Sequence, residues 1–259
     1  MHCLSTKLFR LSLALVFLCY QPLVNAADRP VIAAAASVKF ALQEIAAAFQ
    51  QDTGKSLRIS YASSGNLTRQ IMQGSPFELF LSANAGYVSK LVQQHKTQGQ
   101  ANIYALGRLA LIKPKQSTLL LDANLQGLKL ALQQGKIKHF AMANPEHAPY
   151  GVAARETLQS LKLWEPLQAK LVLGENAAQA AQFTSSAAAE AGLISYSLAL
   201  ATVLQKQTEH VLIPATHHQP LQQSMVLLKN AGETAQHFFN YLQQDKARVI
   251  LSRYGYSAP

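Results

Sequence analysis

The sequence predicts an α/β protein with two lobes and a ligand cleft between them. Segments with the pattern of strands alternate with segments of helical periodicity along most of the chain, which is typical of largely parallel sheets. The pattern restarts after Pro114, so we expect two similar lobes. No linker rich in Gly or Ser separates them, and the connections should be short crossing strands. The predicted division gives residues 27–108 and 216–259 to lobe I, and residues 109–215 to lobe II.

The first 26 residues have the pattern of a secretory signal peptide. Two basic residues precede an apolar run at 11–18, and small residues favour cleavage after Ala26. The run is too short to span a bilayer. Both cysteines of the chain, Cys3 and Cys19, lie in this leader. The mature chain is therefore expected to have no disulfide and no thiolate site, and to reach the bacterial periplasm.

The charge of the chain favours an anionic partner. The formal net charge is +10 at pH 7, which would steer small anions toward the protein. The basic residues do not gather in runs with interleaved aromatic residues, so we expect no nucleic-acid partner.

The first half of the chain reads as three strand–helix units followed by a longer strand. Small and apolar residues at 31–36 predict a buried strand, and apolar residues at spacings of four and three predict the helix after it. The expected strands are 31–36, 56–62, 78–82 and 104–112, and the expected helices are 37–51, 67–72 and 85–94.

The second half repeats this alternation with shorter segments. The expected strands are 139–143, 169–173, 191–195, 210–214 and 225–229. The expected helices are 152–163, 177–183, 196–204 and 233–254, the last broken near 244–245, with a helix or turn at 125–135.

Four turns share one chemistry, because each follows a predicted strand and opens a predicted helix. They are Ser37, 63–65, 149–151 and 176–177, two in each half of the chain. The first N–H groups of a helix have no acceptor within the helix, and the helix dipole favours negative charge there. Ser37 stands where an N-cap is expected. If the halves face each other, these turns converge on one cleft and form a cage of neutral donors for a small, fully ionised anion.

Eight stretches together carry a resemblance to a known family. They are AAAASVKFAL at 33–42, YASSGNLTRQI at 61–71, PFELFLSANAGYV at 76–88, YALGRLALIKP at 104–114, NPEHAPYGVAARETL at 144–158, GENAAQAAQF at 174–183, AGLISYS at 191–197 and FFNYLQQDKARVILSRYGY at 238–256. No single stretch decides the resemblance, but they follow in family order over nearly all of the mature chain. With these stretches the chain resembles the periplasmic molybdate-binding proteins of bacterial ABC importers.

The resemblance implies a type II periplasmic binding-protein fold that closes on molybdate or tungstate. It implies no enzymatic activity and no cofactor, with molybdenum present only in the bound oxyanion and without direct protein ligands. The implied partners are the oxyanion and the membrane permease of an ABC importer, and the implied state is a monomer.

Carried over by position, the resemblance also implies a ligand set. Ser37 and Ser64 would each give a hydroxyl and a backbone N–H, while Tyr150 and Ala177 would give backbone N–H groups. Some relatives use a tyrosine hydroxyl from the strand that matches 192–197. That position falls on Ser195 here, with Tyr196 one residue later, and these two are secondary candidates because a one-residue shift turns a strand side chain to the other face.

Other functions remain as alternatives. Sulfate or another tetrahedral oxyanion is the runner-up ligand, since sequence does not give the size of the cavity. A secreted hydrolase could use His147 and Glu146 as base and orienter, but no activated nucleophile is marked. His217 and His218 lack a third metal ligand at useful spacing. Ferric ion would require tyrosinate or carboxylate ligands, of which the four turns offer few.

Overall fold

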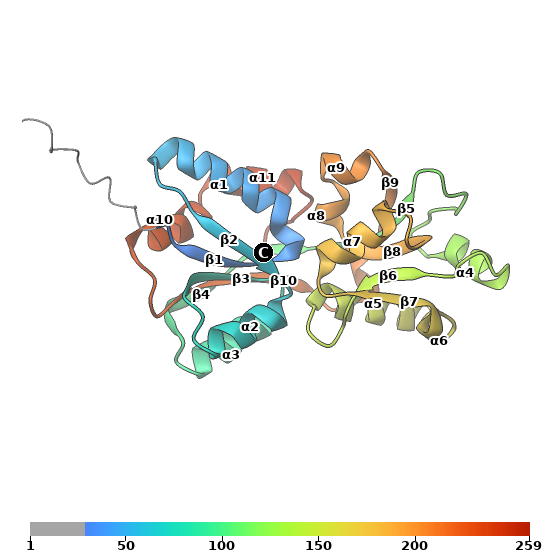
Figure 1. Ribbon diagram of the computed structural model, residues 1–259, viewed down its shortest axis with the longest axis horizontal. Coiled ribbons are helices and arrows are strands. Elements are labelled where there is room, and N and C mark those ends of the chain that lie inside the picture. Colours follow the sequence, from blue (N-terminus) through green and yellow to red (C-terminus); the bar gives the residue numbers. More distant parts are fainter. Residues whose placement is uncertain (1–28) are drawn as a thin grey trace, which may run out of the picture.

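Two α/β lobes lie side by side in the computed structural model, which describes residues 29–259 (Figure 1). Each lobe contains a five-stranded sheet. The strand order is β2-β1-β3-β10-β4 in lobe I and β7-β6-β8-β5-β9 in lobe II. The leader predicted at 1–26 lies outside the described residues. Within the described part of the chain, no helix is long and apolar enough to cross a membrane.

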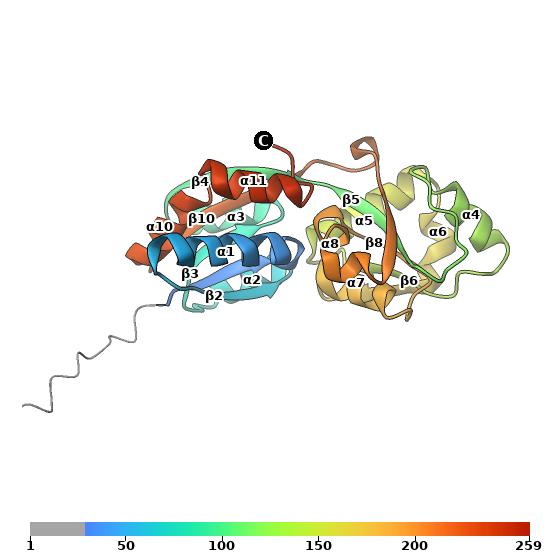
Figure 2. The same ribbon diagram turned by 90° about the horizontal axis from the view of Figure 1, so that it is seen from above.

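Lobe I packs helices on both faces of its sheet (Figures 1 and 2). One face is covered by α1, α10 and α11, where the rings of Phe49 and Phe238 meet edge to face at 5.1 Å. The other face is covered by α2 and α3 around Phe80 and Leu67. The elements are β1 Val31–Ala35, η1 Ala36–Val38, α1 Lys39–Thr53, β2 Arg58–Ala62, α2 Ser64–Met72, β3 Phe77–Ser82, α3 Ala85–Gln93, β4 Thr97–Gly107, β10 Leu221–Leu228, α10 Glu233–Tyr241 and α11 Asp245–Arg253.

Lobe II has the same layered construction around a sheet of short strands. Strand β6 is the parallel neighbour of β7 and β8, and its four residues are all buried because helices cover both faces. The elements are β5 Leu109–Pro114, α4 Gln126–Gln133, β6 Phe140–Ala143, α5 Pro149–Ser160, α6 Trp164–Leu167, η2 Gln168–Lys170, β7 Leu171–Gly174, α7 Ala177–Ser185, β8 Ala191–Ser195, α8 Tyr196–Ala199, α9 Thr202–Gln205, β9 Thr208–Leu212 and η3 Ala215–His217.

The sheets are mixed rather than largely parallel. Strand β10 runs antiparallel to β3 and β4, and β5 runs antiparallel to β8 and β9. These are the strands that enter a lobe after the chain has crossed from the other one, so their direction follows from the crossing and not from a strand–helix–strand repeat.

The chain crosses between the lobes where the sequence predicted one continuous strand. The segment 104–112 is divided at Arg108, since β4 ends at Gly107 in the sheet of lobe I and β5 begins at Leu109 in the sheet of lobe II. The return crossing joins β9 to β10, and Figure 2 shows both connections. The C-terminal residues join the same region, because Leu106 and Ser257 exchange two backbone hydrogen bonds.

Two further expectations need correction, and a third is confirmed. Helix α5 begins at Pro149, three residues before the predicted start, because proline is favourable in a first helical turn. The helix expected at 196–204 is two short helices, α8 and α9. The break expected near 244–245 is present and separates α10 from α11.

Candidate anion-binding site

All four predicted turns line a single cavity between the lobes. Lobe I contributes the end of β1 with η1, the start of α2, and Ala83 after β3, while lobe II contributes the first turns of α5 and α7. The cavity is narrow, with an empty volume of about 200 Å³ including its open mouth. Its lining is Ala35, Ala36, Ser37, Ala62, Ser63, Ser64, Ala83, Ala148, Pro149, Tyr150, Asn176 and Ala177. None of these side chains carries a formal charge.

Ser37 lies in the short 3-10 turn η1 and is not a helix cap. The residue before α1 is Val38, and no side chain caps that helix. The Ser37 side chain is buried, and within residues 29–259 its Oγ makes no hydrogen bond of good geometry, although the hydroxyls of Tyr150 and Tyr256 lie near it. A buried hydroxyl without a partner costs free energy. Ser37 is therefore a donor that a bound anion would satisfy.

Ser64 is the first residue of α2, and the serine before it performs the capping. The Oγ of Ser63 accepts a hydrogen bond from the Asn66 N–H, which frees Ser64 from that role. The Ser64 Oγ accepts from the Ala83 N–H at 3.0 Å. This bond uses a lone pair of the hydroxyl and leaves its hydrogen available to donate into the cavity.

Tyr150 and Ala177 present backbone N–H groups from two helix N-termini of lobe II. Tyr150 is the second residue of α5 and Ala177 is the first residue of α7. The cap of α7 is Asn176, whose Oδ1 accepts from the N–H groups of Ala178 and Gln179. Neither bond uses the Ala177 N–H, and a first-turn N–H has no acceptor inside its own helix.

The secondary candidates lie outside the lining of this cavity. Ser195 is fully buried, with its Oγ 3.4 Å from the Oγ of Ser197. Tyr196 opens α8, and its N–H donates to the Arg108 carbonyl at 2.8 Å. The ring of Tyr196 packs edge to face against His210 at 5.7 Å.

A group of buried hydroxyls lies beside the cavity, and sequence reasoning missed it. The Tyr256 hydroxyl is 3.1 Å from the Oγ of Ser197, which donates to the Ser37 carbonyl oxygen at 2.5 Å. Burial raises the pKa of Tyr256 to about 12. Burial also raises the pKa of Tyr150. Both phenols are therefore neutral at physiological pH. Tyr256 is over 100 residues from the serine turns along the chain, so no local sequence pattern could have predicted that it lies beside Ser197 and Ser37.

The residues considered for other chemistries do not assemble a second reactive centre. The Glu146 carboxylate lies 3.9 Å from Arg155, while His147 faces Ser63 across the cleft. The Nδ1 of His217 lies 2.9 Å from the Ser160 Oγ. Residues 29–259 contain no group of three or more His, Cys, Asp or Glu side chains placed to hold a metal ion.

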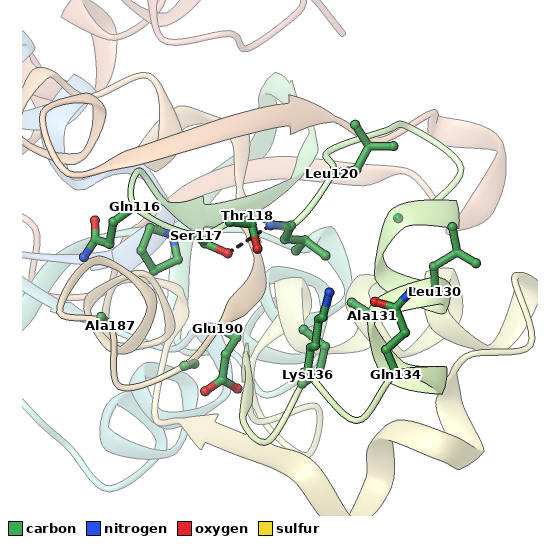
Figure 3. A pocket seen from close by; sticks show the side chains of 15 residues that line it. Gln116, Ser117, Thr118, Leu120, Leu130, Ala131, Gln134, Lys136, Ala187 and Glu190 are labelled. Atoms are coloured by element: carbon green, nitrogen blue, oxygen red, sulfur yellow. Dashed lines mark hydrogen bonds between the residues drawn. The ribbon is translucent and has the colours of Figure 1, made fainter.

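A larger groove lies entirely within lobe II, away from the four turns. Figure 3 shows its side chains, which include Leu120, Leu130, Lys136 and Glu190. Its empty volume is about 1200 Å³. It contains none of the predicted donors, so size alone does not identify the anion site.

Comparison with known proteins agrees with the two-lobed architecture. Residues 30–257 match the family described as bacterial extracellular solute-binding protein. The chain belongs to this family. The resemblance to molybdate-binding proteins is also confirmed, since the ModA protein of Rhodobacter capsulatus is 32% identical over 234 residues, which cover 89% of each chain. The ModA protein of Azotobacter vinelandii is 33% identical over 228 residues, covering 87% of this chain and 88% of the relative.

A solved structure supports the same assignment. The periplasmic molybdate-binding protein of Azotobacter vinelandii superposes on this solute-binding protein with a TM-score of 0.81 and 29% identity. The match covers 89% of this chain and 100% of the other. The predicted fold class, a periplasmic binding protein with two α/β lobes, is confirmed. The hydrolase alternative is rejected, since the family consists of solute-binding components of transport.

Proposed function

We propose that this solute-binding protein captures molybdate, and also tungstate, in the cavity between its lobes and delivers the anion to the permease of an ABC importer. The observation that supports this proposal is the buried, unpartnered hydroxyl of Ser37 in a cavity with an uncharged lining. Ser64, Tyr150 and Ala177 complete the proposed donor set, so that each lobe contributes two of the four residues.

The donor chemistry suits a fully ionised tetrahedral oxyanion. Serine hydroxyls and first-turn N–H groups donate hydrogen bonds, and each bond to a charged group contributes about 1.5–3 kcal/mol. Such a cage disfavours an anion that carries a proton, because its O–H would need an acceptor. The proposal leaves Ser195 and Tyr196 outside the donor set, since neither lines the cavity.

We propose that binding closes the lobes by a hinge motion at the crossing strands. The moving units would be residues 27–108 with 216–259 on one side and 109–215 on the other. Closure would let both lobes donate to one anion, and the permease would recognise the closed form. Secretion through the predicted leader places the protein in the periplasm under this proposal, where it would act as a monomer.

Calorimetric titration of the purified mature protein tests this function. Molybdate, tungstate, sulfate and phosphate would be titrated separately at one ionic strength. We expect tight one-to-one binding of molybdate and tungstate, and no binding of sulfate or phosphate. Sulfate binding with no response to molybdate would assign the same cage to another transport substrate. The absence of binding for all four anions would reject the oxyanion function.

A further inference from the structure

The rim of the cavity carries contacts between the lobes that the donor set does not explain. The loop before α5, in lobe II, meets the first turn of α2, in lobe I. The Gly65 N–H donates to the His147 carbonyl oxygen at 2.9 Å. Gly65 is in the first turn of its helix and has no acceptor there. The opposite lobe therefore supplies the acceptor for this N–H.

The side chain of His147 reinforces this contact. Its Nδ1 lies 2.9 Å from the Ser63 Oγ, and its Nε2 lies 3.8 Å from the Glu175 carboxylate. The side chain is 14% exposed, so the contact is largely removed from water. Because the Ser63 Oγ also caps α2, His147 is linked to the turn that presents Ser64.

A second polar contact continues this rim. The Nδ2 of Asn66 donates to the Glu175 carboxylate at 3.2 Å, which again joins lobe I to lobe II. Arg69 donates to the Oδ1 of the same Asn66. Because Arg69 takes the Oδ1 of Asn66, the Nδ2 of that amide is left to face the Glu175 carboxylate. Two side-chain contacts, His147–Ser63 and Asn66–Glu175, and one backbone pair thus connect the start of α2 to the loops before α5 and α7.

The backbone at this seam has no room for a side chain. A Cβ built on Gly65 would lie 2.7 Å from the His147 carbonyl oxygen and 3.0 Å from its Cα. The φ angle of Gly65 is not positive, so alanine would suit the helix itself. Glycine at this position permits the close approach of the opposite lobe.

We propose that His147, with Gly65, Ser63, Asn66 and Glu175, forms an interlobe latch that holds the closed form and slows release of the anion. The latch rests on the proposed function, since it acts on the closed, loaded state. His147 is a positioning residue, because it contacts the turn that carries Ser64 and does not line the cavity. Under this proposal the donor set in the cavity selects the anion, and the latch at the rim sets the rate at which the anion dissociates.

Stopped-flow kinetics of molybdate binding tests the latch. His147→Ala removes the side-chain contacts and keeps the carbonyl, and we expect dissociation to be faster by about five- to tenfold with an unchanged association rate. His147→Asn places an amide oxygen near the Nδ1 position and should recover part of the wild-type dissociation rate. His139→Ala is the matched control, because His139 is an exposed histidine of the same lobe.

Gly65→Ala tests the backbone contact by a second route. It should leave the separate lobes folded but raise the dissociation rate, because its Cβ obstructs the closed form only. Equal dissociation rates for wild type, His147→Ala and Gly65→Ala would overturn the latch while leaving anion binding intact.

Small-angle scattering distinguishes failure of the latch from failure of the proposed function. If calorimetry showed that the wild type binds no oxyanion, the proposed function would fail. If the wild type binds molybdate, the latch predicts a larger radius of gyration for molybdate-loaded His147→Ala and Gly65→Ala than for the molybdate-loaded wild type. Identical radii for the three loaded proteins would reject the latch and leave the proposed function intact.

Discussion

The hydroxyl of Tyr150 occupies the space that a side chain on Gly107 would need. A Cβ built on Gly107 would lie 2.2 Å from the Tyr150 Oη and 3.2 Å from its Cζ. Gly107 ends β4 just before the chain crosses to lobe II, and Tyr150 belongs to the first turn of α5. The pair therefore links a crossing strand to a helix N-terminus of the candidate site.

Gly107→Ala should weaken anion binding, because the added methyl group displaces the Tyr150 ring from the crossing strand. Overpacking of this kind costs about 1–3 kcal/mol, and calorimetry would measure it as a higher Kd. Adding Tyr150→Phe removes the atom nearest to the new Cβ and should restore part of the affinity. A double variant no better than Gly107→Ala would assign the obstruction to the Gln223 amide, whose Nε2 lies 2.7 Å from the added Cβ.

Ser37→Ala should separate stability from affinity. The Ser37 hydroxyl is buried without a partner, so its removal should leave the unliganded protein as stable as wild type, or more stable. Affinity for the anion should fall by about 1–3 kcal/mol, since a desolvated donor is lost. Urea unfolding without ligand and calorimetry with molybdate give the two values. Unchanged affinity would remove Ser37 from the donor set.

Ser64→Ala should lower both the unfolding free energy and the affinity for molybdate, whereas Ser37→Ala should lower only the affinity. The Ser64 Oγ accepts from the Ala83 N–H, and its loss leaves a buried N–H unpaired. We expect a loss of about 1–3 kcal/mol in unfolding free energy, together with weaker molybdate binding. Ser89→Ala, an exposed serine of α3, is the control and should change neither measurement.

Ala177→Pro should remove one donor without disrupting the helix. Ala177 is the first residue of α7, where proline is well tolerated, and Asn176 before it is already extended at φ −159° and ψ 174°. The Kd for molybdate should rise while the melting temperature stays near wild type. Ala177→Gly keeps the N–H and should bind normally. Normal binding by the proline variant would exclude this N–H as a ligand.

Asp52→Asn should reduce the acid sensitivity of lobe I. The Asp52 carboxylate accepts from Lys246 Nζ at 2.8 and 2.6 Å and from the Tyr241 hydroxyl at 2.8 Å. The hydrogen bond from Lys246, and then that from Tyr241, lowers the pKa of Asp52. A lowered folded-state pKa stabilises the protein above the unfolded value of about 3.9, and this stability is lost as pH falls through the folded value.

Urea unfolding at pH 7 and pH 3 measures how much stability the Asp52 carboxylate contributes. Wild type should lose more unfolding free energy than Asp52→Asn between the two pH values. The control is Asp245→Asn, at an exposed carboxyl that opens the helix carrying Lys246. An equal loss in wild type and Asp52→Asn would show that the ion pair does not contribute to the acid response.

The local sequence pattern predicted most elements because it reflects local physics. Apolar spacing located α1 and α3. Asn84 caps α3, with its side chain accepting from the Gly86 N–H. The pattern failed at 104–112, where one apolar run serves two sheets, because periodicity carries no information about which sheet a strand joins.

The sequence by itself determined the alternation of strands and helices, the two lobes, and the four turns whose residues line one cavity. Only the tertiary structure decided that Ser37 is an unpartnered hydroxyl and not a cap, that Tyr256 lies beside it, and that His147 faces Ser63 from the other lobe. The physical reason is distance along the chain. Caps and periodicity depend on neighbours within a few residues, whereas these contacts join segments brought together only when the lobes pack.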